Sequence, residues 1–311
     1  MRTPWNVVSL DSLGVLRARG PDARKFLQGQ LSNDMSRLSG EQALLAGYHN
    51  VQGRAIALLR LIELTPEDFL AILPRELVGA LATRLGKFIL RAKVKLSDES
   101  AAWQVHGVLV GPEADSAAAA HAAMLPPPGG AREVDGTRIV RIGESPPRLL
   151  LVRPVDSPPL AGHAPLSLSD WQLAVVAAGE PQVYAATSEE FVAQMLNLDL
   201  IEGISFEKGC YTGQEVIARA HFRGRVKRRM QRFITEAAAA LAPGDTARLA
   251  DGRALTVVQA AQHADGRCEF LAVTALSAEA EGPSEVPGTR ALAALQLPLP
   301  YPLPPQAAGH D

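Results

Sequence analysis

The residues most able to do chemistry lie in one uninterrupted segment, Lys208-Gly209-Cys210-Tyr211-Thr212-Gly213-Gln214-Glu215. Thr212 and Glu215 stand three positions apart just before the apolar stretch Val216-Ile217-Ala218. This order predicts a capping box at the start of a helix. Cys210 would then lie just ahead of a helix N-terminus, where free amides, the helix dipole and nearby Lys208 favour thiolate over thiol. We therefore predict a reactive thiol at Cys210.

A dense basic run follows this segment. Its cations are Arg219, Arg223, Arg225, Lys227, Arg228, Arg229 and Arg232. One interpretation is a solvated strand and hinge, since basic runs are common on protein surfaces. The other is an anion funnel in which Gly224 ends the helix and an extended segment presents its cations on one face, namely Arg223, Arg225, Lys227 and Arg229. Phosphate or polyglutamate could bind there.

Hydrophobic spacing predicts the elements of the first half of the chain. A helix begins after Gly20-Pro21-Asp22, buries Phe26, Leu27 and Leu31, and ends near Asn33-Asp34. Leucines 77, 81 and 85 predict a second helix. Strands are predicted at residues 43–48, 55–64, 69–73 and 93–96. This order is typical of a strand, strand, helix, strand unit.

The next part of the chain continues with short strands. They are predicted at residues 103–110, 132–134, 137–142 and 148–152, with an Ala-rich helix at about 115–124. The proline-rich stretch 154–165 predicts a connection between domains, and a helix carrying Trp171 starts at Ser167 or Ser169. From residue 226 onward, strands near 248–249, 255–258 and 269–273 predict a small antiparallel barrel. Residues 237–240 look like low-complexity helix or loop.

Composition is that of a soluble globular protein. The chain has 311 residues, of which 47% are hydrophobic and 21% charged, with a net charge of -2. Cys210 and Cys268 lack a second thiol or histidine at ligand spacing, which argues against a metal site. Residues 1–5 lack the apolar core of a secretory signal and no apolar stretch spans a bilayer, so we expect a cytoplasmic protein without membrane partners.

The stretch from Ile204 to Arg219 resembles the signature of the YgfZ-type folate-binding proteins, relatives of the glycine-cleavage T-protein. The likeness extends to Gln194-Met195-Leu196-Asn197-Leu198-Asp199 and to residues 26–34, Phe-Leu-Gln-Gly-Gln-Leu-Ser-Asn-Asp. The order of the three blocks resembles the family over most of the chain. The last eighty or so residues match only as a short β-rich end.

The resemblance implies an α+β, T-protein-like three-domain architecture. Residues 1–50 and 155–225 would form a discontinuous folate-binding first domain, and 51–154 a ferredoxin-like inserted domain. Residues 226–300 would form a C-terminal antiparallel β-barrel, followed by a flexible tail at 301–311. Trp171 and Cys210 would both face a central cavity of the first domain.

A reduced folate needs an aromatic wall, fixed polar groups and cations at the mouth of its site. By resemblance, the residues that would bind tetrahydrofolate or a one-carbon derivative are Trp171, Gln28, Asn33, Gln194, Lys208, Tyr211, Gln214 and Arg223. Judged alone, Trp171 can equally be a core residue, and Gln28 and Asn33 fit ordinary cap or turn positions. The chain departs from some relatives at Leu13, where they carry an aromatic residue.

Aminomethyl transfer also requires a carboxylate that moves a proton at the folate nitrogen. The Asn-rich motif and following Asp of the T-protein are missing from residues 69–76, although Glu76 lies nearby. Asp34 and Asp199 are carboxylates at turn boundaries, where capping is the simpler role. We therefore predict that the T-protein chemistry is lost. His221 follows Cys210 by about three helical turns and is predicted to be a surface residue.

Two functions follow from the resemblance. The first is a folate-binding accessory protein that supports synthesis or repair of iron-sulfur clusters, and thereby cluster-dependent tRNA modification, with iron-sulfur proteins or assembly factors as transient partners. The alternative is a one-carbon transferase dependent on tetrahydrofolate. Direct RNA binding through Arg219 to Arg232 is less favoured, because Phe222 and Phe233 are its only aromatics. No P-loop, dinucleotide fingerprint or common hydrolase motif occurs.

Overall fold

The computed structural model describes residues 5–111, 125–144, 147–222, 224, 226–277 and 290–304. The described residues group into two compact units. Unit 1 lies within 1–48, 57–171 and 207–211, and unit 2 within 49–56, 172–206 and 212–311. The three-domain division expected from the sequence has other boundaries than this grouping and stays a prediction. No helix of the described residues is long and apolar enough to span a membrane.

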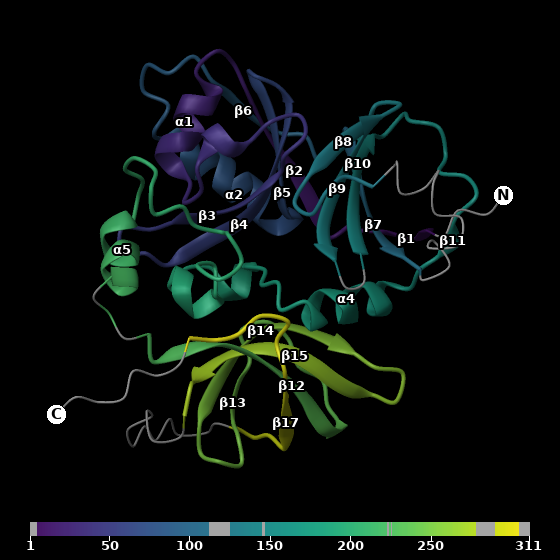
Figure 1. Cartoon of the computed structure of the whole chain (residues 1–311), viewed down its shortest axis with the longest axis vertical. Coiled ribbons are helices and arrows are strands. Elements are labelled where there is room, and N and C mark those ends of the chain that lie inside the picture. The colour runs from purple at the N-terminus through teal and green to yellow at the C-terminus, as the bar shows by residue number, and fades with distance from the viewer. Residues whose placement is uncertain are drawn as a thin grey trace. The chain divides into compact units, whose positions relative to one another are not determined.

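Unit 1 contains a five-stranded sheet in the order β3-β4-β5-β2-β6. Its strands are β2 (Leu13–Arg19), β3 (Leu44–His49), β4 (Ala55–Thr65), β5 (Asp68–Pro74) and β6 (Lys95–Asp98). Every residue of β5 is buried, as expected for a strand covered on both faces. Helix α2 (Arg75–Gly86) packs on β2, β5 and β6 (Figure 1). It buries Leu77, Val78, Leu81 and Leu85, which are the apolar residues at helical spacing.

A second sheet of unit 1 has six strands in the order β11-β1-β7-β10-β9-β8 (Figure 1). They are β1 (Trp5–Ser9), β7 (Trp103–Val110), β8 (Ala131–Val134), β9 (Thr137–Glu144), β10 (Pro147–Pro154) and β11 (Ala164–Pro165). One face carries the buried residues Val7, Val108, Val110, Ile139, Leu149 and Leu151. Because side chains alternate along β7, Gly107 belongs to the opposite face from Val108.

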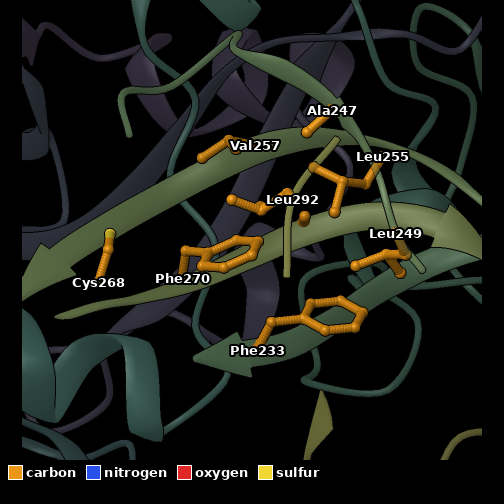
Figure 2. Packing of buried hydrophobic residues seen from close by; sticks show 9 residues of the cluster. Phe233, Ala247, Leu249, Leu255, Val257, Cys268, Phe270 and Leu292 are labelled. Atoms are coloured by element: carbon orange, nitrogen blue, oxygen red, sulfur yellow. The ribbon is translucent and has the colours of Figure 1, made fainter. Parts of the chain in front are cut away.

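Unit 2 is built on a six-stranded sheet in the order β16-β13-β14-β15-β12-β17. Its strands are β12 (Arg228–Ala238), β13 (Thr246–Arg248), β14 (Ala254–Gln262), β15 (Arg267–Ala275), β16 (Arg290–Ala291) and β17 (Ala294–Leu297). Figure 2 shows the core of this sheet, in which the rings of Phe233 and Phe270 stack with centroids 5.5 Å apart. Cys268 lies at one end of the cluster, which confirms it as a packing residue.

The remaining helical elements are short. They are α1 (Ala23–Gln30), α4 (Leu168–Ala177) and α5 (Gln214–Phe222), with 3-10 turns η1 (Met35–Arg37), η3 (Ala185–Thr187) and η4 (Ala193–Leu196). Ser167 caps α4, because its hydroxyl accepts from the amide of Asp170 and its carbonyl from the amide of Trp171. The prediction that Ser167 or Ser169 begins this helix is thus resolved in favour of Ser167.

Most predicted elements are confirmed, and the errors have local causes. Strands β1 and β2 were missed, since short strands interrupted by polar residues give a weak signal. Residues 237 and 238, predicted as low-complexity helix or loop, are the last two residues of strand β12. The Ala-rich helix predicted at 115–124 lies outside the residues that the structure describes. The ferredoxin-like character of the insertion and closure of the last sheet into a barrel stay predictions.

His49, the last residue of β3, makes the fold sensitive to acid. Its side chain is fully buried, and burial lowers its pKa from 6.5 to about 4 against the opposing backbone hydrogen bond with Gly53. Between pH 4 and 6.5, His49 therefore binds a proton in the unfolded chain but not in the folded one. We expect stability that is complete above pH 6.5 and falls toward pH 4. Urea denaturation across this range should show a smaller loss for His49→Gln, and an unchanged loss for exposed His221→Gln.

Candidate functional site

Helix α1 and the turn that follows it form the frame of the site in unit 1. Gln28 spans this turn, since its Nε2 donates to Asp34 Oδ1 at 3.1 Å and its Oε1 accepts from the Met35 amide at 2.7 Å. Asn33 Nδ2 donates to the carbonyl of Leu45 at 2.7 Å, and its Oδ1 accepts from the amide of Asp34. Both amides therefore brace the turn, in agreement with their interpretation as turn residues.

Lys208, which is distant in the sequence, holds this turn in place by hydrogen bonds. Its Nζ donates to the carbonyl oxygens of Gln28 at 2.6 Å, Leu31 at 2.5 Å and Asn33 at 3.0 Å. An ammonium group has three donors, so the three carbonyls use all of them. Only 7% of Lys208 is exposed. We call Lys208 and residues 28–34 the Lys208 loop.

The Lys208 loop has unusual electrostatics. Burial lowers the pKa of Lys208 to about 8, and the Asp34 carboxylate acts in the opposite direction. The Ser36 amide, which hydrogen-bonds to Asp34, is the main cause that lowers the pKa of that carboxyl group. Asp34 thus caps η1, as expected for it from the sequence. Lys208 Nζ lies 5.0 Å from the centroid of the buried Tyr211 ring, and burial raises the pKa of that phenol.

These contacts change the role predicted for Lys208. To bind the anionic tail of a folate, its ammonium group would have to leave three carbonyl oxygens, two of them in buried hydrogen bonds. We therefore assign Lys208 to positioning of the loop. Gln28, Asn33 and Tyr211 lie around the same loop, so the structure brings four of the predicted site residues together. Their contact with a folate stays a prediction.

Trp171 lies in unit 1 and is 5% exposed. Its ring packs so closely on Gly107 of β7 that a Cβ at position 107 would lie 2.6 to 2.8 Å from the ring carbons. Only glycine leaves room for this contact. The ring therefore has a core role at Gly107, and its role as an aromatic wall for a folate stays a prediction.

Cys210 is an exposed thiol between two buried neighbours, Lys208 and Tyr211. The flanking residues are held in the core of unit 1, so the backbone at Cys210 is fixed while its side chain faces solvent. The described residues contain no group of three or more His, Cys, Asp or Glu side chains arranged to hold a metal ion. Reactivity of this thiol stays a prediction.

The predicted capping box at Thr212 is off by one residue. Helix α5 starts at Gln214, and Gly213 is at the N-cap position because its carbonyl accepts from the amide of Ile217. Gly213 has a φ of 84° and a Cβ there would lie 2.4 Å from the carbonyl oxygen of Asn50. The position requires glycine, which outweighs the side-chain cap that Thr212 would supply.

Gln194 of η4 and Gln214 of α5 are the predicted site residues of unit 2. Gln194 is fully buried, and its Nε2 donates to the carbonyl of Ile217 at 2.6 Å. Its Oε1 is buried and has no hydrogen-bond partner among the described residues. Gln214 is partly exposed at the first position of α5. Gln194 thus offers a buried acceptor for an N–H group.

The fold divides the basic run and takes Arg229 out of the predicted anion-binding face, while Lys227 is exposed and its part in that face stays a prediction. Arg229 is buried in β12 and forms a bidentate pair with Asp199, with N–O distances of 2.9 and 2.8 Å. Arg232 pairs with Glu269 at 2.8 Å. Neither arginine is available to an external anion. Asp199 is accordingly an ion-pair partner, not the cap that we predicted. Arg223, predicted to contact folate, lies outside the described residues, as does Arg225.

His221 confirms its assignment as a surface residue. It is exposed, and its ring stacks on that of Phe206 with centroids 3.8 Å apart. Phe222 meets both rings edge-on. These contacts all lie within unit 2 and use the imidazole for packing.

Comparison with known proteins defines the class. The fold is that of the T-protein: aminomethyltransferase T of the glycine cleavage system from Bartonella henselae superposes with a TM-score of 0.67 over 88% of this chain and 79% of that chain, at 14% identity. Two curated relatives, each named tRNA-modifying protein YgfZ, are more similar in sequence. The protein of Cronobacter sakazakii is 32% identical over 86% of this chain and 83% of its own length.

The relative from Klebsiella pneumoniae is 34% identical over 86% of this chain and 84% of its own length. The chain therefore belongs to the YgfZ family. No protein-family model matches it.

Proposed function

We propose that this protein is a folate-binding accessory protein that supports synthesis or repair of iron-sulfur clusters, and thereby cluster-dependent tRNA-modifying enzymes. Membership of the YgfZ family carries the proposal, because relatives covering most of the chain are named tRNA-modifying proteins. The T-protein fold supports a link to folate. The protein would act in the cytoplasm.

Unpaired acceptors fit a reduced folate. A pterin presents several N–H groups that need acceptors in a buried site. Gln194 Oε1 and, at the end of α1, Gln30 Oε1 are both buried without a hydrogen-bond partner among the described residues. Gln30 was not among the predicted site residues. A bound tetrahydrofolate would supply a carrier for a one-carbon unit, and Gln194 and Gln214, both in unit 2, are the residues proposed to hold it.

The proposed function assigns the exposed thiol of Cys210 a chemical role separate from folate binding. An exposed cysteine on a fixed backbone can make transient contact with an iron-sulfur protein or assembly factor.

Aminomethyl transfer is the alternative function. It would need a positioned carboxylate near residues 69–76, but β5 is apolar from Phe69 to Leu73 and Glu76 is exposed on α2. Turnover with tetrahydrofolate and an amine donor would favour the alternative.

Anaerobic calorimetric titration with tetrahydrofolate tests the folate site. We expect the wild type and Cys210→Ala to bind alike, and Gln194→Leu to bind about tenfold more weakly because a buried N–H group loses its acceptor. Gln259→Leu is the matched control, since Gln259 Oε1 is also buried without a partner among the described residues. Absence of binding by the wild type would refute the folate proposal, and equal losses in both variants would refute the contact with Gln194.

A genetic experiment tests the cluster-related role. In a strain lacking the gene, the wild type should restore nucleoside modifications made by iron-sulfur enzymes, measured by mass spectrometry of tRNA digests. Cys210→Ser should fail to restore them at equal protein level. Full restoration by Cys210→Ser would remove the thiol from the proposal.

A further inference from the structure

The face of α2 that does not contact the five-stranded sheet carries a groove. The opposite face of the helix is buried against the five-stranded sheet. The groove encloses about 580 Å³ and is lined by Gly79, Ala80, Thr83, Arg84, Lys87 and Phe88. A Cβ added at Gly79 would meet no atom within 4 Å. A side chain from another molecule could therefore approach the helix closely here. We call this the α2 groove.

Large apolar side chains are exposed beside the α2 groove. Phe88 is 48% exposed, and Leu90, just beyond the helix, is 87% exposed. Leu90 has the highest exposure among the large apolar side chains of the described residues. Exposed apolar groups gathered at a concave surface are typical of a site for another protein.

The same edge is strongly basic. Lys87, Arg91, Lys93 and Lys95 are all exposed, and no carboxylate occurs in the sequence from Leu77 to Ser97. None of these four cations forms an ion pair with another described residue. The backbone at Lys93 is fixed, because its amide donates to the Asp22 carboxylate at 2.7 Å and its carbonyl accepts from the Asp22 amide at 3.3 Å. The cations therefore project from a held segment.

We infer that the α2 groove docks an acidic amphipathic segment of a partner protein. Apolar side chains of that segment would fill the groove over Gly79 and Ala80 and cover Phe88 and Leu90, as in other helix-in-groove complexes. Its carboxylates would meet the exposed cations along the edge, which speeds association and selects an acidic partner. This site goes beyond the proposed function and does not depend on folate binding.

Two other occupants fit the surface less well. Single-stranded nucleic acid is held by stacking of bases on several aromatic side chains, and Phe88 is the only aromatic residue of the groove. Exposed Leu90 and the apolar groove would add nothing to phosphate contacts. A lipid surface is bound by apolar side chains that project into it, and it offers no side chain to fill a concave groove.

Fluorescence anisotropy with a labelled peptide tests the inference. The probe is an amphipathic helix with leucines at positions i, i+3, i+4 and i+7 and glutamates on both flanks. The wild type should bind it, with affinity falling as salt is raised. The variants K87E/K93E and F88S/L90S should each bind about tenfold more weakly. R132E/R290E, which makes the same change in net charge at exposed sites elsewhere, should bind like the wild type.

A charge swap sharpens the test. A peptide with lysines in place of the glutamates should bind K87E/K93E more tightly than the wild type. Lack of binding by the wild type, or equal weakening by K87E/K93E and R132E/R290E, would overturn the inference. It would also be overturned if oligouridine, or vesicles of phosphatidylglycerol and phosphatidylcholine, competed with or replaced the peptide at Phe88 and Lys87. Tetrahydrofolate binding should be unchanged in every variant, so that failure here is distinguishable from failure of the proposed function.

Discussion

Replacing Arg229 by methionine is expected to destabilise unit 2 by about 3–5 kcal/mol. The guanidinium and the Asp199 carboxylate are each 6% exposed, and the arginine also donates to the carbonyl of Gln194 at 3.0 Å. Its removal leaves the carboxylate buried without a countercharge. The loss is a large part of the total stability of an ordinary domain.

The pair also holds an irregular turn against β12. Asn197 adopts a left-handed conformation with φ of 58°, and its Nδ2 donates to the carbonyl of Met230 at 2.9 Å. Arg229 lies beside Met230 and bonds to both Gln194 and Asp199, on either side of Asn197. Loss of Arg229 should therefore release the turn at 194–199 first, and native-state hydrogen exchange of its amides measures this release directly.

Two controls test whether the loss of stability comes from the burial of the Arg229–Asp199 pair and not from the loss of an ion pair alone. Arg267 and Asp265 form an ion pair at 2.7 Å on the surface, and Arg267→Met should leave the urea denaturation midpoint unchanged. The double variant R229M/D199N should be more stable than R229M alone, because it leaves no buried charge unpaired. Equal midpoints for Arg229→Met and Arg267→Met would contradict the argument.

Sequence patterns found most of the scaffold but could not find these partners. Leu77, Leu81 and Leu85 have a helical period, and α2 forms because all three can be buried together. Arg229 belongs to an equally visible run of cations, yet its role depends on Asp199, thirty positions earlier. Charge density in a sequence does not reveal which charges the fold will bury, so the run was interpreted as one surface.

The Lys208 loop shows a stronger limit of prediction from sequence. The partners of Lys208 are backbone carbonyls of residues 28, 31 and 33, and every residue type has such a group. No spacing or composition signal could identify them. The only trace in the sequence is the family resemblance, which marks residues 26–34 and 204–219 as related without saying that they touch. The structure supplies this link, and it turns a predicted ligand contact into a positioning role.

The fixed residues on either side of Cys210 also affect what its thiol can do. The backbone from Lys208 to Tyr211 would lose little conformational entropy if a partner bound at the thiol. Lys208 is tied by three hydrogen bonds and Tyr211 is buried, so both neighbours of the Gly209-Cys210 pair are fixed. A reactive side chain on such a backbone needs no further ordering when a partner binds. Release of Lys208 should therefore affect any function of Cys210 as well as stability.

Lys208→Met is expected to destabilise unit 1 by about 2–3 kcal/mol, because it leaves three carbonyl oxygens without their donor. Methionine keeps most of the side-chain volume and removes the ammonium group. Lys208→Arg should not restore stability, since a planar guanidinium cannot direct donors to three carbonyls around one nitrogen. Lys25→Met, at an exposed position of α1, is the control and should behave like the wild type. Fluorescence of tryptophans 5, 103 and 171, all in unit 1, reports the transition in urea.

The pH dependence gives the same variant a second, independent outcome. The pKa of Lys208 is about 8 in the folded protein and 10.5 when unperturbed, so between these values the unfolded chain binds more protons than the folded one. The wild type should therefore gain stability relative to Lys208→Met as pH rises from 8 to 10.5. The iodoacetamide reaction rate of Cys210 should change in Lys208→Met but not in Lys25→Met. A constant stability difference across this pH range would contradict the lowered pKa of Lys208, and an unchanged thiol reaction rate would show that the Lys208 loop does not influence Cys210.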